Sequence, residues 1–185
     1  MKKFELTSEF TINALGTKLF RVRALVDFGT VHAGDMGGYV ESEENLSQEG
    51  NAWVFGNARV SGNATVSGNA TVSGDAWVSG DATVSGNATV SGDAWVFGDA
   101  WVSGNAEIFG DADYATVKGF GRTFRNTTFF RCNDEKIRVR CGCFFGDLNE
   151  FRAIVKRTHG DGKMAKEYLA IADLMEMHFG DERNE

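Results

Sequence analysis

The feature that most constrains the fold is a six-residue repeat that runs without interruption through the middle of the chain. Ten consecutive units lie between Gly50 and Phe109, and each begins with Gly, then Asn or Asp, then Ala. A variable residue follows, the fifth position is Val or Ile, and the sixth is Ser or Phe. A period held for ten units without an insertion indicates stacked copies of one small structural unit.

The chemistry of the unit predicts a short strand followed by a corner. The Ala and Val positions are two residues apart, so they lie on the same face of a strand. The variable residue between them and the Ser or Phe after them then face outward. Gly followed by Asn or Asp suits a corner because these residues tolerate positive φ.

This pattern, over residues 36–121, resembles the hexapeptide-repeat family of left-handed parallel β-helices, in which three units make one triangular coil of 18 residues. The resemblance implies about five coils, stacked at ~4.8 Å. Folded in this way, Asn51, Asn69, Asn87 and Asn105 share one corner and predict a hydrogen-bonded amide ladder. The segments on either side are expected to cap the coils, since open strand edges promote aggregation.

The chain is expected to have three parts. Residues 1–35 form an N-terminal capping segment with a strand pair, residues 36–121 form the β-helix, and residues 122–185 form an α+β appendage. Apolar patterning and a capping box predict a hairpin and two helices in the appendage. The predicted class is therefore mainly β: a left-handed parallel β-helix with a strand cap and a C-terminal β-hairpin plus two-helix appendage.

Basic residues concentrate in residues 116–140, which carry a charge of +5 in a chain of −7. A hairpin register that pairs Phe130 with Val139 places Arg131 directly opposite Arg138, and like charges in that position are destabilising. Such a cluster requires an anion: the protein's own Asp corners, a phosphate-bearing ligand or an acidic partner protein. The predicted anion-binding residues are Arg122, Arg125, Arg131, Arg138 and Arg140.

The outward positions of the repeat carry many aromatic residues, which predict an interface because exposed apolar patches usually have a partner. The predicted interface residues are Trp53, Trp77, Trp95, Trp101, Phe55, Phe97 and Phe109. Because hexapeptide-repeat proteins of this type are commonly trimers, we expect a homotrimer. Cover by the chain's own C-terminal segment and a ligand-stacking site are the alternatives.

The sequence gives little support to catalysis. Acyltransferases built on this helix use a histidine near the coils and often extrude a loop, whereas His32, His159 and His178 all lie outside an uninterrupted repeat. An acyltransferase with a site at the subunit seam is the alternative to a non-catalytic binding protein. No catalytic residue, metal or cofactor is predicted.

Three cysteines are too few for a disulfide framework. In the expected hairpin register, Cys132, Cys141 and Cys143 continue one apolar face, which favours a buried core over a zinc site.

The whole chain is also similar to uncharacterised hexapeptide-repeat proteins of tailed phages and prophages. Four segments carry that resemblance: Asp35–Glu41, Asn45–Val54, Cys141–Phe144 and Thr158–Asp161. It implies a phage origin and no particular reaction. The function we expect is capture of a host molecule, such as a phosphorylated small ligand or a host protein.

Charge and hydropathy limit the classes of partner and the cellular location that we expect for this protein. A net charge of −7 argues against general nucleic-acid binding, which rewards a basic surface. No run of ~18 apolar residues predicts a membrane span. The first ten residues lack the apolar core of a signal peptide, so a cytoplasmic protein is expected, in the host cytoplasm if it is phage-encoded.

Overall fold

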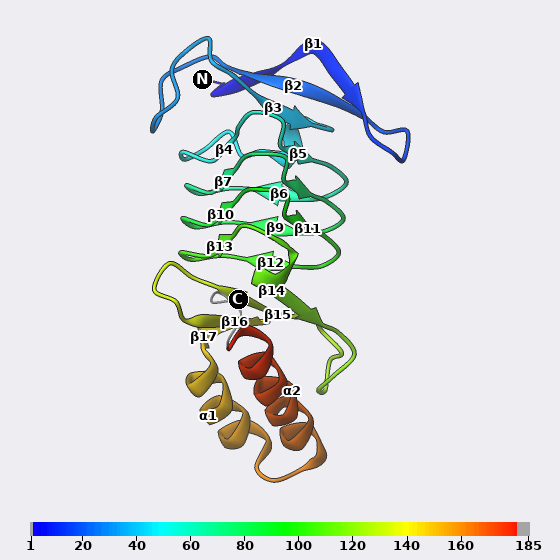
Figure 1. The fold of residues 1–185 in the computed structure, drawn as a ribbon, viewed down its shortest axis with the longest axis vertical. Helices are drawn as coiled ribbons and strands as arrows, with labels where there is room; N and C mark the ends of the chain where they lie inside the picture. The colour runs from blue at the N-terminus through cyan, green and yellow to red at the C-terminus, as the bar shows by residue number, and fades with distance from the viewer. Residues whose placement is uncertain (1, 181–185) are drawn as a thin grey trace. The chain divides into compact units, whose positions relative to one another are not determined.

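A computed structural model describes residues 2–180, and the chain divides into two compact units, Met1–Asp111 and Ala112–Glu185. Figure 1 shows stacked short strands in the first unit, and strands followed by two helices in the second. The structure confirms the predicted fold class, with one difference in the number of coils. Among the described residues, no helix is long and apolar enough to cross a membrane.

The first unit is a parallel β-solenoid whose strands line three sides. One side stacks β3, β5, β8 and β11, the second stacks β4, β7, β10 and β13, and the third stacks β6, β9 and β12. The strands are β3 (Met36–Val40), β4 (Trp53–Val54), β5 (Arg59–Val60), β6 (Thr65–Val66), β7 (Thr71–Val72), β8 (Trp77–Val78), β9 (Thr83–Val84), β10 (Thr89–Val90), β11 (Trp95–Val96), β12 (Trp101–Val102) and β13 (Glu107–Ile108).

From β4 onward each strand pairs with the strand 18 residues away, as between Thr71 and Thr89, whereas β3 pairs with β5 at a separation of 20 residues. The solenoid has about four turns rather than the expected five. After β13 the chain forms a 3-10 turn at Asp111–Asp113, and β14 (Tyr114–Val117) pairs antiparallel with β15 (Thr127–Arg131) in the second unit. The residues just beyond the ten repeats therefore leave the stack.

Burial along the repeat follows the predicted phase. The Ala and the Val or Ile of every unit are at most 1% exposed, so they form continuous inward columns. The corner glycines have φ between 59° and 73°, where a side chain would be strained. The predicted amide ladder is present: Asn51, Asn69 and Asn87 each donate Nδ2–H to the Oδ1 of the asparagine one coil further, at 3.0–3.1 Å.

The N-terminal segment caps the first coil. β1 (Phe4–Ile12) and β2 (Lys18–Ala24) form an antiparallel pair, β2 pairs with β3, and a 3-10 turn follows at Glu43–Asn45. Because the Phe4 and Phe28 rings lie edge-on to Trp53, at 6.3 and 5.3 Å, that indole is only 1% exposed. The expectation that Trp53 belongs to an exposed interface is therefore wrong.

The second unit is a four-stranded antiparallel sheet with two helices. The sheet order is β14-β15-β16-β17, with β16 at Ile137–Cys141 and β17 at Phe144–Asp147. Helices α1 (Leu148–His159) and α2 (Lys163–Phe179) form a common core with the sheet. The predicted capping box holds α1: the Glu150 amide donates to Asp147 Oδ1 at 2.9 Å, and the Asp147 amide donates to Glu150 Oε2 at 2.8 Å.

The predicted hairpin register is wrong by one residue. Phe130 pairs with Arg138, and Arg131 pairs with Ile137, so five residues rather than four separate the paired strands. The turn is closed by the Cys132 amide, which donates to the Lys136 carbonyl, and Glu135 adopts a φ of 61°. A one-residue shift turns side chains to the opposite face, so Arg131 and Arg138 lie on opposite faces of the sheet.

The same shift separates the cysteines. Cys132 is buried, Cys141 is half-buried, and Cys143 is exposed beyond the end of β16. The expectation of one shared buried face is therefore wrong for this trio, although Cys132 does lie in the interior.

Candidate ligand-binding site

Three of the five predicted anion-binding arginines have partners within the protein. The Nε of Arg131 lies 3.3 Å from Asp113 Oδ1, and its guanidinium lies over the Phe179 ring at 5.3 Å. The Nη2 of Arg138 donates to Asp134 Oδ2 at 2.6 Å. Arg140 also interacts with another group of the protein. Because Arg131 lies on the opposite face of the sheet from Arg138, the three side chains do not converge on one site.

The other two arginines lie together beside a cavity. Arg122 and Arg125 belong to the loop between β14 and β15, and both line a cavity of about 330 Å³ in the second unit. Both are exposed, and neither forms an ion pair with any residue that the structure describes. No described Asp or Glu lines the cavity. Its mouth is therefore cationic.

The loop is held in place by two close approaches that only glycine permits. A Cβ on Gly121, at φ 71°, would collide with the Tyr168 hydroxyl, and a Cβ on Gly142, at φ 59°, would collide with Arg125 Nη1. Arg125 Nε donates to Thr123 Oγ1 at 2.7 Å. The Arg125 guanidinium therefore lies against the turn between β16 and β17.

The cavity wall is apolar and comes from the core of the unit. Phe144 on β17, Phe151, Ile154 and Val155 on α1, and Tyr168 on α2 form it. Burial raises the pKa of the Tyr168 phenol, and its contact with Cys141 adds to this effect. The phenol therefore stays neutral near pH 7 and donates to the Phe120 carbonyl at 3.3 Å.

The end of α1 adds polar groups to the cavity. Thr158 and His159 line it, and the His159 ring lies nearly parallel to that of Tyr168, at 6.0 Å and 24°. Cys141 and Cys143 line it as well. Residues of the Cys141–Phe144 and Thr158–Asp161 segments, which the sequence singled out separately, thus meet at one cavity. Together with the predicted Arg122 and Arg125, these segments were the signals of this site in the sequence.

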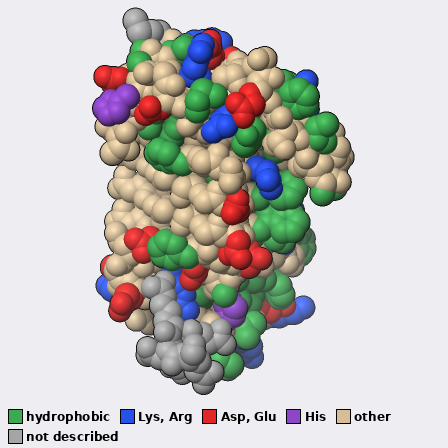
Figure 2. Space-filling view, turned by 45° about the horizontal axis from the view of Figure 1, so that its top comes forward, with side chains coloured by type: hydrophobic (Ala, Val, Ile, Leu, Met, Phe, Trp, Pro, Cys, Tyr) green, Lys and Arg blue, Asp and Glu red, His purple; other side chains and the backbone are tan. Residues whose placement is uncertain are grey.

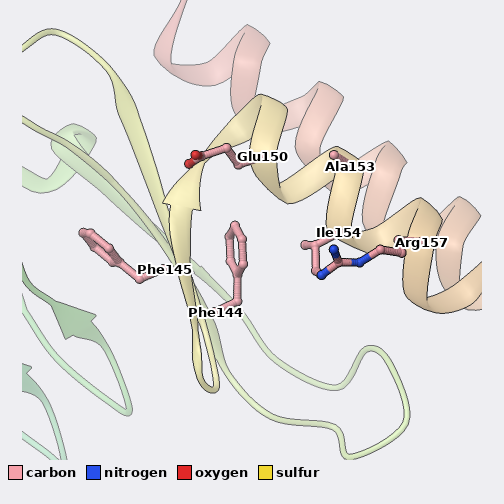
Figure 3. A pocket seen from close by; sticks show the side chains of 6 residues that line it. All are labelled: Phe144, Phe145, Glu150, Ala153, Ile154 and Arg157. Atoms are coloured by element: carbon pink, nitrogen blue, oxygen red, sulfur yellow. The ribbon is translucent and has the colours of Figure 1, made fainter.

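A second hollow, of about 430 Å³, lies between β17 and α1 (Figure 3). Phe144 points toward the helix there, whereas Phe145 lies on the opposite side of the strand. Its charged lining residues are Glu150, which belongs to the capping box, and Arg157. Because one carboxylate balances one guanidinium, this hollow is less suited to an anion than the first.

The remaining predicted interface residues are at least partly exposed. Trp77 and Trp95 stack at 5.1 Å and 3°, and each indole N–H donates to a serine hydroxyl of the preceding coil. The other exposed fractions are 45% for Trp95, 56% for Phe97, 39% for Trp101 and 48% for Phe109, and Phe55 is half-buried. In the view of Figure 2, hydrophobic side chains are most numerous along the right-hand side. The homotrimer stays a prediction.

The described part of the chain contains no group of three His, Cys, Asp or Glu side chains that could hold a metal ion. His32 lies 4.0 Å from Asp27 in the N-terminal segment. The cavity histidine, His159, has an aromatic neighbour rather than a described carboxylate.

The comparisons with known proteins concern the solenoid. The repeat matches the YdcK beta solenoid repeat. The matched segments are residues 52–68, 58–74, 66–80, 76–92 and 82–98. A curated relative, "Uncharacterized acetyltransferase YdcK" of Escherichia coli (strain K12), is 39% identical over 62 residues, which cover 30% of this chain and 19% of the relative. These similarities support a β-helix repeat protein, and the expected phage origin stays a prediction.

Proposed function

We propose that the second unit is a non-catalytic binding module for small anions, carried on a β-solenoid scaffold. The observation that supports it best is the pair of arginines at the cavity mouth, Arg122 and Arg125, which have no ion-pair partner among the described residues. Two neighbouring cations without a counter-charge repel each other, and a bound anion relieves that repulsion. The proposal keeps the predicted anion but replaces the predicted five-arginine cluster with two residues.

The geometry suits recognition of an oxyanion. A guanidinium presents several N–H donors in a rigid plane that matches phosphate or carboxylate oxygens. The hydrogen bond from Arg125 Nε to the Thr123 hydroxyl restrains the Arg125 side chain before a ligand arrives. Less side-chain entropy is then lost on binding.

The lack of a described carboxylate beside His159 in the cavity lining favours binding over chemistry. A catalytic histidine usually needs a partner that orients its ring and stabilises its charge. Among the described residues that line the cavity, none is a carboxylate, and the ring of His159 stacks on Tyr168 instead.

Acetyl transfer is the second candidate, because the E. coli relative carries the name of an acetyltransferase. The segments that match the repeat family, between residues 52 and 98, contain no histidine or cysteine. We expect no release of free CoA from acetyl-CoA above the blank, in the presence or absence of amine acceptors. Release that is lost in His159→Ala would support the enzyme and oppose the binding module.

Thermal unfolding in increasing phosphate or sulfate tests the anion site. A ligand that binds the folded state stabilises it by RT ln(1 + [L]/Kd), about 2.7 kcal/mol at a hundredfold excess over Kd. We expect the melting temperature to rise with phosphate at low salt and the effect to shrink near 1 M salt, where the screening length falls to ~3 Å.

The variant Arg125→Glu should fold and lose the phosphate response. Lys136→Glu is the matched control, because it makes the same charge change at an exposed turn residue outside the cavity. It should keep the response. A wild-type protein whose melting temperature is insensitive to phosphate and sulfate would refute the binding module.

A further inference from the structure

The lining of the cavity beside Arg122 and Arg125 combines two chemistries. It includes the two guanidiniums and the Thr123 hydroxyl, and also Phe144, Ile154 and other apolar side chains. A bare inorganic anion would pair with the arginines and leave the apolar lining in contact with water. Burying that lining against a ligand is favourable, at roughly 25 cal/mol per Å² of apolar surface removed from water.

The size of the cavity limits the apolar part of the ligand. A volume of about 330 Å³ lies at the lower end of the ~300–1,000 Å³ range of small-molecule sites. The cavity therefore has room for one ring and its anionic group, and not for several linked rings. The flat faces of Phe144 and Tyr168 in the lining favour a planar ring over a flexible chain.

The orientation follows from the position of α1. Its last turn brings Thr158 and His159 to the cavity, and the last carbonyls of a helix carry a partial negative charge. An anionic group is therefore disfavoured beside the last turn of α1 and favoured beside the arginines.

We propose that this cavity binds an aromatic phosphate monoester, with the phosphate between Arg122 and Arg125 and the single ring against Phe144 and Ile154. The inference rests on the proposed anion-binding function and adds the class of ligand. A nucleoside monophosphate fits less well, because its base and ribose are two linked rings and the ribose carries the phosphate. It serves as the contrasting probe below.

Calorimetric titration with inorganic phosphate, phenyl phosphate and cytidine 5′-monophosphate tests the inference. We expect phenyl phosphate to bind at least tenfold more tightly than inorganic phosphate, and more tightly than cytidine 5′-monophosphate. Tighter binding of the nucleotide than of phenyl phosphate would overturn the single-ring ligand. If phenyl phosphate binds no more tightly than inorganic phosphate, the ring site is overturned and the anion site stands. If none of the three binds, the anion site falls as well.

Two variants locate the ring. Ile154→Ser removes apolar wall and should reduce the gain from the ring while leaving affinity for inorganic phosphate unchanged, and Arg125→Ala should weaken all three ligands. Leu174→Ser is the matched control, since Leu174 is 54% exposed on α2 and does not line the cavity. If Ile154→Ser fails to fold, the methyl resonance of Ile154 in the wild-type protein tests whether the ring of the ligand lies beside it. Phenyl phosphate should shift it through the ring current and inorganic phosphate should not, and equal shifts would overturn the ring site.

Discussion

A single buried lysine holds the N-terminal end of the solenoid. Lys3 is only 4% exposed, and its Nζ donates to the carbonyls of Ala52 at 2.9 Å and Gly50 at 3.4 Å. The ammonium also lies 4.9 Å from the centre of the Phe28 ring. Burial lowers the pKa of Lys3 from 10.5 to about 8. The charge thus completes the hydrogen bonding of the first coil at a desolvation cost.

That lowered pKa makes the contribution of Lys3 depend on pH. Between pH 8 and 10.5 the unfolded lysine keeps its proton while the folded one loses it, so the unfolded state binds more protons and stability rises with pH. We expect the free energy of unfolding of the wild type, minus that of Lys3→Met, to increase across this window. Urea unfolding at several pH values measures it.

Lys2→Met is the control for this prediction, because Lys2 is the exposed neighbour and pairs with Glu43 on the surface. Its difference from the wild type should change less over the same pH range. A difference between wild type and Lys3→Met that stays level or falls as the pH rises would contradict the lowered pKa of Lys3.

At the scale of the element, the sequence predicts the solenoid better than the appendage for a physical reason. Each repeat places its own alanine and valine inward, so the phase is set by neighbouring residues, and the columns through Val66, Val84 and Val102 follow directly. The hairpin register depends instead on the length of one turn. The turn has five residues, with Glu135 in the left-handed region of φ, and no sequence pattern predicts this turn length.

The candidate site was predictable only in part for the same reason. Arg122 and Arg125 were found because basic charge is visible in a sequence. Their separation from Arg131 and Arg138 depends on the register and on specific pairing with Asp113 and Asp134. The apolar wall comes from helix residues that read as ordinary core positions, so nothing in the sequence marked them as a cavity lining.

The solenoid strands also make a direct prediction about the core. Val84 on β9 is fully buried between Val66 and Val102 of the neighbouring coils, so Val84→Asp would bury a carboxylate without a partner. The penalty is several kcal/mol, on the order of 2–7 for an unpaired polar group and more for a charge. We expect this variant to be insoluble or unfolded by circular dichroism.

Thr83→Asp is the matched control for Val84→Asp, since Thr83 is the outward neighbour on the same strand and is half-buried rather than enclosed. It should stay soluble and β-rich. A soluble, β-rich Val84→Asp protein would mean that the valine column does not carry the stability of the solenoid.

At the scale of the whole molecule, the exposed aromatics of the solenoid are the strongest sign of assembly. Trp95 and Phe97 belong to one repeat, and their rings lie 5.7 Å apart, whereas Trp101 lies on the next side of the solenoid; each is at least 39% exposed. Exposed apolar surface of this kind usually marks an interface. Trp53, once counted with them, is covered by the N-terminal cap and contributes nothing to it.

We therefore expect a homotrimer in solution that these aromatics hold together. Light scattering should give three times the 20.2 kDa chain mass at micromolar concentration. Phe97→Ser should lower the mass toward that of one chain, because Phe97 is 56% exposed and its loss removes interface area without opening the solenoid core. Leu174→Ser, an equally exposed apolar change in the second unit, should leave the mass unchanged. A monomer mass for the wild-type protein would contradict the predicted trimer. The exposed aromatic residues would then require a different partner.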